Sequence, residues 1–209
     1  MYRELRFHKR KIMIVISNPT EIVNEINIIH ALFEESMELF HIRKPDTSEE
    51  ELRCYIAAID SKYHSKLVLH QHYNLVAEFQ LERLHFTEKV RQTISDTYQK
   101  PVPFLSTSVH TIADFNNLAE SYDYAFIGPI YPSISKLDYK PTQNLLKQTK
   151  ERNNWKTKWI ALGGISAENI VATLTQGFDD VALLGTIWNS TNPIQNFKKC
   201  QKIVHTYLP

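Results

Sequence analysis

The sequence predicts an α/β fold, a single (βα)₈ TIM barrel in which eight parallel strands alternate with eight helices. Short apolar runs alternate with longer segments of helical periodicity, and the connections are short and contain no proline-rich linker. With 209 residues, 43% of them hydrophobic, the chain can bury one core. We therefore expect one domain over residues 1–209, with residues 1–11 as a basic N-terminal arm. An open doubly wound sheet is the alternative, because counting strands does not prove closure.

The expected elements follow in order along the chain. The strands are predicted at Ile12–Ser17, Glu38–Arg43, Lys66–His70, Arg83–Thr87, Phe104–Ser108, Tyr124–Gly128, Trp159–Gly163 and Val181–Gly185. The helices are predicted at 21–35, 48–62, 72–80, 89–98, 111–121, 142–153, 167–176 and 193–206. Hydroxyl residues followed by acidic ones mark three helix starts, at Thr47 or Ser48, at Thr111 and at Ser166.

The five glycines are placed where the backbone needs them. Gly177 follows a predicted helix, where a left-handed residue is expected. The others are Gly128, Gly163, Gly164 and Gly185, at the ends of the last three strands. Bare backbone N–H groups there suit an anion, and barrels bind phosphate after strands seven and eight. We predict that Gly163, Gly164, Leu184 and Gly185 bind a terminal phosphate.

Two strands carry polar residues on one face. In the second strand His41 and Arg43 share a face, because side chains alternate along a strand. Both are expected to point into the barrel near its mouth, where the planar guanidinium of Arg43 suits phosphate or carboxylate. In the fifth strand Ser106, Ser108 and His110 share a face. His110 is a candidate acid/base catalyst, with helix capping as its structural alternative.

Two further histidines, His70 and His85, end the third and fourth strands, so four histidines are expected to ring one mouth. A zinc site is the sharpest interpretation of such a ring. No carboxylate beyond Glu88 stands at a matching strand end, and no complete ligand pattern is present, so we predict no metal site.

After the sixth strand a long loop, Gly128–Pro141, contains three prolines, the two serines Ser133 and Ser135, and Lys136. Long loops at this end of a barrel usually bind ligands or act as lids. We predict that Ser133, Ser135 and Lys136 hold an anionic group. A solvated surface loop is the alternative.

Composition excludes several classes. The net charge of +1 and the absence of basic-aromatic runs argue against nucleic acid as a partner. No segment has the length of a membrane span or the pattern of a leader, so we expect a cytoplasmic protein without a membrane partner. Cys54 and Cys200 are expected to be packing residues.

Taken together, the motifs resemble the thiamin phosphate synthase family, most closely its thiazole tautomerase (TenI-type) branch. The resemblance covers most of the chain. It is carried by His41-Ile-Arg43, Ser108-Val-His110, the Gly-Pro-Ile-Tyr-Pro-x-x-x-Lys136 stretch and Ala161-Leu-Gly-Gly-Ile165. It implies a barrel that binds a thiazole phosphate through the four phosphate residues above. Arg43 would face a diphosphate, and His41, Ser108, Ser133, Ser135 and Lys136 would contact substrate. A homodimer is expected on the same basis.

The sequence departs from the synthase pattern at the metal ligands. His70-Gln71 replaces the usual Asn-Asp, and His85-Phe-Thr-Glu-Lys-Val replaces the usual His-Leu-Gly-x-x-Asp, so both magnesium-binding aspartates are missing. Lys44-Pro45 also follows Arg43, which displaces or removes a second cation. This favours a metal-independent tautomerase, which needs no cofactor and uses His110 as acid/base.

Two alternatives stay open. The first is the synthase, which joins hydroxymethylpyrimidine diphosphate to thiazole phosphate with Mg²⁺, and in which Glu88 or Asp138 would have to replace the lost ligands. The second is a barrel that binds a phosphorylated heterocycle without turnover.

Overall fold

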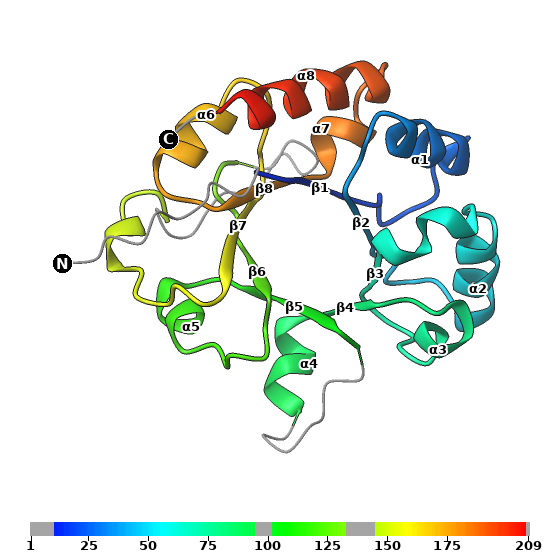
Figure 1. The fold of residues 1–209 in the computed structure, drawn as a ribbon, viewed down its shortest axis with the longest axis horizontal. Helices are drawn as coiled ribbons and strands as arrows, with labels where there is room; N and C mark the ends of the chain where they lie inside the picture. Colours follow the sequence, from blue (N-terminus) through cyan, green and yellow to red (C-terminus); the bar gives the residue numbers. More distant parts are fainter. Residues whose placement is uncertain (1–10, 95–101, 133–144, 208–209) are drawn as a thin grey trace.

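The computed structural model describes residues 11–94, 102–132 and 145–207, and these form a closed parallel barrel. The strands pair in sequence order, and the last pairs with the first, as Figure 1 shows in the view down the barrel. The eight strands are β1 (Met13–Ile16), β2 (Leu39–Ile42), β3 (Leu67–Leu69), β4 (Arg83–Phe86), β5 (Phe104–Val109), β6 (Tyr124–Ile127), β7 (Lys158–Leu162) and β8 (Asp180–Leu183). The predicted TIM barrel is confirmed, and the open sheet is excluded.

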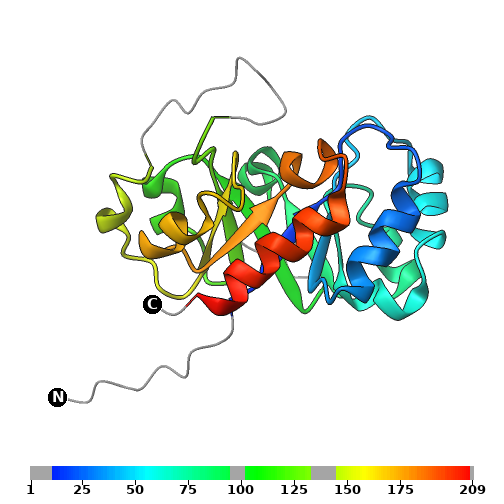
Figure 2. The ribbon, with the colours of Figure 1, turned by 90° about the horizontal axis from the view of Figure 1, so that it is seen from above.

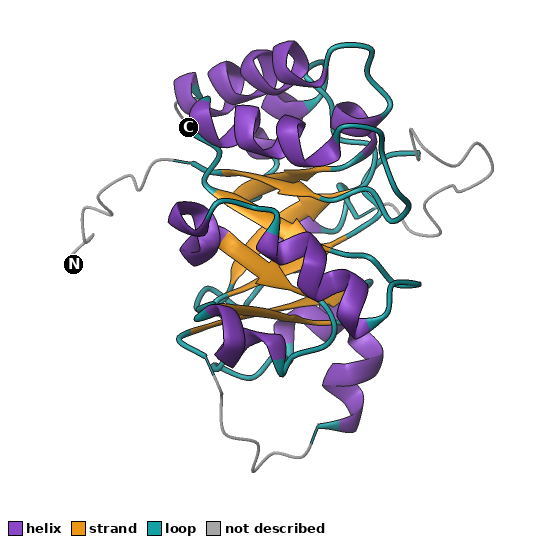
Figure 3. Ribbon diagram, turned by 90° about the vertical axis from the view of Figure 1, so that its right-hand side faces the viewer, coloured by secondary structure: helices purple, strands orange, loops and turns teal. Residues whose placement is uncertain are grey.

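Helices cover the outside of the barrel (Figure 3). They are α1 (Glu25–Glu34), α2 (Glu49–Ala57), α3 (Leu75–Phe79), α4 (Glu88–Thr93), α5 (Ile112–Asn116), α6 (Ile170–Thr175), α7 (Gly185–Trp188) and α8 (Pro193–Thr206), with 3₁₀ turns η1 (Ser61–Lys66) and η2 (Thr149–Glu151). Figure 2 shows α8 lying across the outside of the barrel, where it packs against α1, α6 and α7. Since α8 joins the first helix to the last ones, it helps to hold the two ends of the chain together.

Two of the three predicted helix starts are confirmed. Ser48 caps α2 in a reciprocal capping box with Glu51, and the hydroxyl of Thr111 accepts from the N–H of Asp114 at the start of α5. Ser166 does not cap α6, which begins only at Ile170. A turn that begins at Ser166 precedes that helix. The Asn169 side chain accepts from the Ser166 N–H and donates to the Gly164 carbonyl.

The predicted helix at 142–153 is wrong over its described residues, 145–153, which contain only the turn η2. Arg152 gives the physical reason. Its buried guanidinium donates to three backbone carbonyls and to the Asp179 carboxylate, and these bonds hold the chain extended where a helix would continue. The predicted eighth strand also ends early, because Gly185 begins the short helix α7.

Two apolar layers build the core. The larger lies between strands and helices, and the smaller lies inside the barrel and includes Ile14, Leu39, Phe126, Ile160 and Ala182. The side chains of His41, His85 and Ser106 point into the barrel, as those of the inner layer do. The alternation predicted for β2 and β5 is therefore confirmed. The barrel interior is therefore apolar mainly along β1, β6, β7 and β8, and it carries imidazole and hydroxyl groups along β2 to β5.

The arm at 1–10 lies outside the described residues. Lys11, its last residue, donates to the Phe178 carbonyl at 3.1 Å. Among the described residues, none of the helices has both the length and the apolar character needed to cross a bilayer.

Candidate active site

A cavity of about 490 Å³ opens at the carboxyl ends of the strands. This volume is typical of small-molecule sites, and the position is where barrel enzymes place their chemistry. Seven of the predicted site residues line it: Arg43, Ser108, His110, Gly163, Gly164, Leu184 and Gly185. The predicted residues Ser133, Ser135 and Lys136 lie outside the described part of the chain.

One corner of the cavity is made of glycine backbone. Gly163 and Gly164 have φ angles of +98° and +63°, which side chains of L-residues rarely adopt. Within the described residues, no hydrogen bond is formed by the N–H groups of Gly163, Gly164 and Gly185. These donors are free to meet an anion.

The same glycines also let the chain pack against itself. A Cβ on Gly163 would lie 2.8 Å from the Cα of Pro129, and one on Gly164 would lie 2.7 Å from the Cβ of Tyr131. The segment after β6 therefore rests on the glycine pair, with Tyr131 N–H donating to the Gly163 carbonyl at 3.1 Å. The close approach inferred from the sequence is made, at least in part, by the protein's own backbone.

His110 stands at the rim of the cavity, with 57% of its side chain exposed. Its Nδ1 atom lies 3.0 Å from the carbonyl oxygen of Gly128. Since a carbonyl only accepts, Nδ1 carries the proton. The other nitrogen, Nε2, lies 3.6 Å from Oε2 of Glu88. Nε2 is thus the atom that can exchange a proton with a ligand, with a carboxylate beside it.

The two cations after β2 have different environments. Arg43 is exposed and lines the cavity, and the Ser17 hydroxyl bonds both the N–H and the carbonyl of Arg43 at 2.8 and 3.1 Å. Lys44 is buried, and its ammonium donates to Glu25 at 2.6 Å and to the Thr20 carbonyl at 3.0 Å. Lys44 is therefore committed to a structural ion pair, and Arg43 alone of the two faces a ligand.

His41 lies inside the barrel as predicted, but it does not line the cavity. Its side chain is fully buried, and both ring nitrogens have partners. Nδ1 lies 2.9 Å from Nε2 of His70, and Nε2 lies 2.7 Å from the hydroxyl of Tyr124. The predicted substrate contact of His41 therefore has no support in this arrangement, because Ile16 and Phe126 line the cavity and His41 packs against Phe126 deeper in the barrel.

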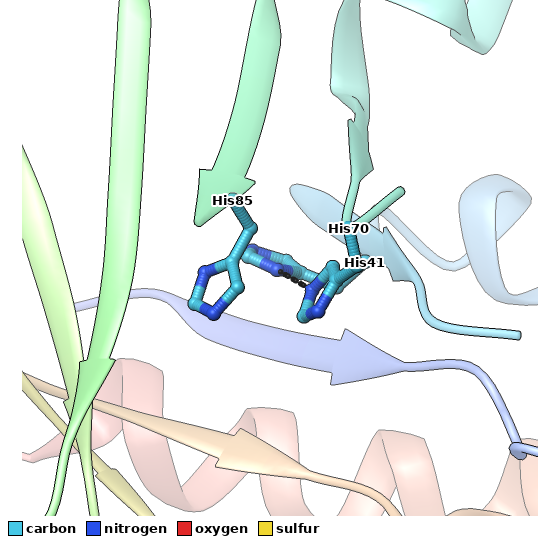
Figure 4. Close-up of side chains that lie close together, drawn as sticks. All are labelled: His41, His70 and His85. Carbon is cyan, nitrogen blue, oxygen red and sulfur yellow. Dashed lines mark hydrogen bonds between the residues drawn. The ribbon is translucent and has the colours of Figure 1, made fainter. Parts of the chain in front are cut away.

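Three of the four histidines expected at the mouth gather inside the barrel, and His110 stands apart from them. Figure 4 shows His41, His70 and His85, which we call the histidine layer. Burial lowers the pKa of all three, to about 3 for His85, and the pKa of Tyr124 is raised by burial. The three imidazoles are therefore neutral near pH 7.

The histidine layer is also the candidate metal-ligand group among the described residues, with ring nitrogens within 4.8 Å of one another. Its geometry suits hydrogen bonding better than coordination. The rings of His70 and His85 stack with centroids 4.1 Å apart and planes at 21°, so their in-plane lone pairs do not converge on one point. Both nitrogens of His85 are bonded, to Ser106 and Ser108 at 2.9 Å each.

Magnesium does not fit the described cavity either. Glu88 is its one carboxylate within the described residues, and its two oxygens face Arg91 at 3.4 Å and His110 at 3.6 Å. Magnesium prefers several hard oxygen ligands in octahedral geometry. The described donors offer one oxygen group and imidazole nitrogens, so they do not make a site of the two-aspartate kind.

Sequence reasoning missed some lining residues, most notably Lys89, which is exposed at the start of α4. Glu88 was considered only as a substitute metal ligand. The signal was available, because both directly follow the end of β4, where a barrel builds its active site.

Comparisons with known proteins agree with this architecture. A family model described as thiamine monophosphate synthase matches residues 13–187. The thiamine-phosphate synthase of Listeria innocua is 26% identical over 165 residues, 76% of this chain and 72% of that protein. That of Mannheimia succiniciproducens is 25% identical over 189 residues, 83% of this chain and 84% of its own.

Solved structures give the same result. Thiamine phosphate pyrophosphorylase from Bacteroides thetaiotaomicron superposes with a TM-score of 0.72 at 30% identity, covering 92% of this chain and 96% of that one. The Pyrococcus furiosus protein of the same name has a TM-score of 0.72 at 13% identity, covers 93% and 96% of the two chains, and so supports the fold alone. With a barrel, a glycine-lined cavity and a family match over most of its length, this chain belongs to the thiamine monophosphate synthase family of thiamine-biosynthesis enzymes.

Proposed function

We propose that this protein is a transferase that joins an aminopyrimidine, supplied as its diphosphate, to a thiazole phosphate. The names of its relatives support this reaction over a one-substrate rearrangement. The observation that carries the proposal is that the cavity has two separate regions suited to anions, one for each phosphorylated substrate.

The first region is the glycine corner after β7 and β8. The bare N–H groups of Gly163, Gly164 and Gly185 would bind the thiazole phosphate, with Leu184 beside them. Such donors recognise a dianion without any cationic side chain. The thiazole ring would then extend toward the centre of the cavity.

The second region is formed by Arg43, which follows β2, and Lys89, which follows β4, and neither strand neighbours β7 or β8. In the closed order of eight strands, β4 lies opposite β8. A guanidinium offers two parallel donors to phosphoryl oxygens. As the ring nitrogen of the thiazole bonds to the pyrimidine methylene carbon, the diphosphate leaves with the electron pair of the broken carbon–oxygen bond. Arg43 and Lys89 would stabilise that leaving charge.

A thiazole tautomerase is the second candidate, and His110 favours it. The tautomerase reaction moves a proton to aromatise a thiazole carboxylate phosphate. His110 keeps its Nδ1 proton on the Gly128 carbonyl, which leaves Nε2 at the cavity for general acid/base work. The absence of a fitting magnesium site among the described donors points in the same direction, because a proton shift needs no leaving-group metal.

A paired turnover assay tests these functions. The purified protein is given both substrates of the synthase reaction, or the thiazole tautomer alone, each with Mg²⁺ and with EDTA. We expect the protein to form thiamine phosphate from the two synthase substrates, and we expect this turnover to continue in EDTA. Aromatised thiazole without thiamine phosphate would establish the tautomerase instead. Tight binding of thiazole phosphate with no product in either assay would indicate a binding protein.

His110→Asn provides a mechanistic check. General acid/base catalysis contributes roughly 10²- to 10⁴-fold. A loss of that size in the tautomerase assay, with thiazole phosphate binding retained, would assign the proton shift to His110. A tautomerase that is unaffected by the substitution would remove His110 from the mechanism.

A further inference from the structure

The cavity and the histidine layer are connected by one side chain, Ser108. Ser108 lines the cavity from the end of β5, and its hydroxyl lies 2.9 Å from Nε2 of His85. His85 is 1% exposed and lies behind Ser108, on the neighbouring strand β4. The other nitrogen of His85, Nδ1, lies 2.9 Å from the hydroxyl of Ser106. Ser106 precedes Ser108 by one inward-facing position on β5. We call Ser106, His85 and Ser108 the serine–histidine chain.

The direction of each hydrogen bond in this chain follows from its inner end. The Ser106 hydroxyl lies 3.2 Å from the carbonyl oxygen of Leu84, which can only accept, and it also bonds the Tyr124 side chain, so its hydrogen has acceptors other than His85. The Ser106 oxygen must then accept from His85, so Nδ1 carries the imidazole proton. The buried ring is neutral, which leaves a lone pair on Nε2. The Ser108 hydroxyl therefore donates to Nε2. This direction satisfies all three contacts at once, whereas the reversed one leaves two oxygens facing each other at Leu84.

We propose that His85 is a positioning residue whose Nε2 accepts the hydroxyl hydrogen of Ser108. Ser108 then presents only oxygen lone pairs to the cavity and selects an N–H donor on the substrate. A phosphoryl or carboxylate oxygen meeting Ser108 would find an acceptor and be repelled. Anions are then left to the glycine corner and to Arg43. A buried acceptor without a donor is unfavourable, and this cost makes the selection effective.

The N–H donor in question is the amino group of the aminopyrimidine, and this assignment rests on the proposed function. Ser108 belongs to β5, beside β4 and on the side of the barrel away from β8. A pyrimidine whose diphosphate meets Arg43 and Lys89 would lie against this wall, while the thiazole phosphate occupies the glycine corner. Ser108 would then hold the pyrimidine by its amine and contribute nothing to diphosphate binding.

The first test reads the proton directly and needs no substrate. Long-range ¹H–¹⁵N correlation spectra of the full chain, labelled at histidine, distinguish the two neutral tautomers. The His85 signals are assigned by their loss in His85→Gln, with His64→Gln as the matched control away from the cavity. Should His85→Gln fail to fold, Ser108→Ala assigns them by shifting the Nε2 resonance alone. We expect a proton on Nδ1 and none on Nε2 at pH 7.5.

Three results would overturn the hydrogen-bond direction: a proton on Nε2, an imidazolium, or stoichiometric zinc in the purified protein that shifts the His85 nitrogens. A flip to the Nε2–H tautomer when inorganic diphosphate binds would also overturn it, because Ser108 would then be donating to an anion.

The second test reads specificity. Binding of the aminopyrimidine diphosphate is compared with that of an analogue carrying hydrogen in place of the amino group. We expect wild-type protein to prefer the amine by roughly tenfold. Ser108→Ala should lose this preference, because the amine loses its acceptor and the analogue no longer meets an unpaired one.

Equal affinity for the two pyrimidines, in a protein that turns over the normal substrates, would refute the inference and leave the proposed function intact. Failure to form thiamine phosphate from the normal substrates would count against the proposed function, and the tautomer of His85 would still decide the direction of the hydrogen bonds.

Discussion

Acid should unfold this protein because of the histidine layer. His41, His70 and His85 have pKa values lowered by burial, and the charged groups that act on them are other histidines and the cations Arg43 and Arg83. In the unfolded chain each returns to an ordinary pKa of about 6.5. The unfolded state therefore binds more protons below that pH, and stability falls as the pH falls. Above about pH 7.5 the effect is absent.

The magnitude follows from the difference between the two states. At pH 5 an unfolded histidine gains about 2 kcal/mol from protonation that a buried neutral one does not. For three residues the sum is about 6 kcal/mol, against a total stability of roughly 5–15 kcal/mol for a folded domain. Between pH 6 and 5 the free energy of unfolding should fall by about 4 kcal/mol per pH unit, the slope for three protons.

Urea unfolding followed by circular dichroism at half-unit steps from pH 7.5 to 5 measures this slope. His85→Gln removes one of the three groups and should reduce the slope by about a third, whereas the control His64→Gln removes a histidine outside the layer. A slope corresponding to one proton or fewer in wild-type protein would refute the reasoning. So would histidine signals from the layer that titrate in the folded protein near pH 6.5.

Four further substitutions test single residues. Gly163→Ala should destabilise the fold by about 3 kcal/mol and weaken phosphate binding, since its φ of +98° and a contact of 2.8 Å to Pro129 both oppose a Cβ. Gly177→Ala, with a φ of +100° and no atom within 4 Å, should lose only about 1–2 kcal/mol in thermal unfolding, and equal losses would contradict the steric argument. Lys44→Met should lower the free energy of unfolding by about 3–5 kcal/mol because it strands a buried Glu25, and a small loss in urea titration would show that water reaches the pair. Arg43→Ala should raise the KM for the pyrimidine diphosphate roughly 10- to 100-fold at unchanged thiazole KM, and a parallel rise in both would place Arg43 elsewhere in the reaction.

The order and polarity of this barrel could be predicted from the sequence. Strand parity predicted that His41 and Arg43 share one face of the second strand and that Ser106 and Ser108 share one face of the fifth, because alternation along a strand is local geometry. Glycines at the last strand ends marked the corner where backbone N–H groups are bare, since the positive φ angles of Gly163 and Gly164 favour glycine. Such features depend on a few neighbouring residues.

The tertiary structure decided how deeply each side chain is buried and which group it bonds. Three strand ends look alike in sequence, yet His41 and His85 are buried in a hydrogen-bonded layer while His110 is exposed at the rim. Lys44 follows Arg43 directly, but only packing reveals that Glu25 takes its charge. The burial of a side chain depends on strand stagger around the closed barrel, and its bonding partner can lie far away in the chain. Neither has a local signature, because both arise from closure itself.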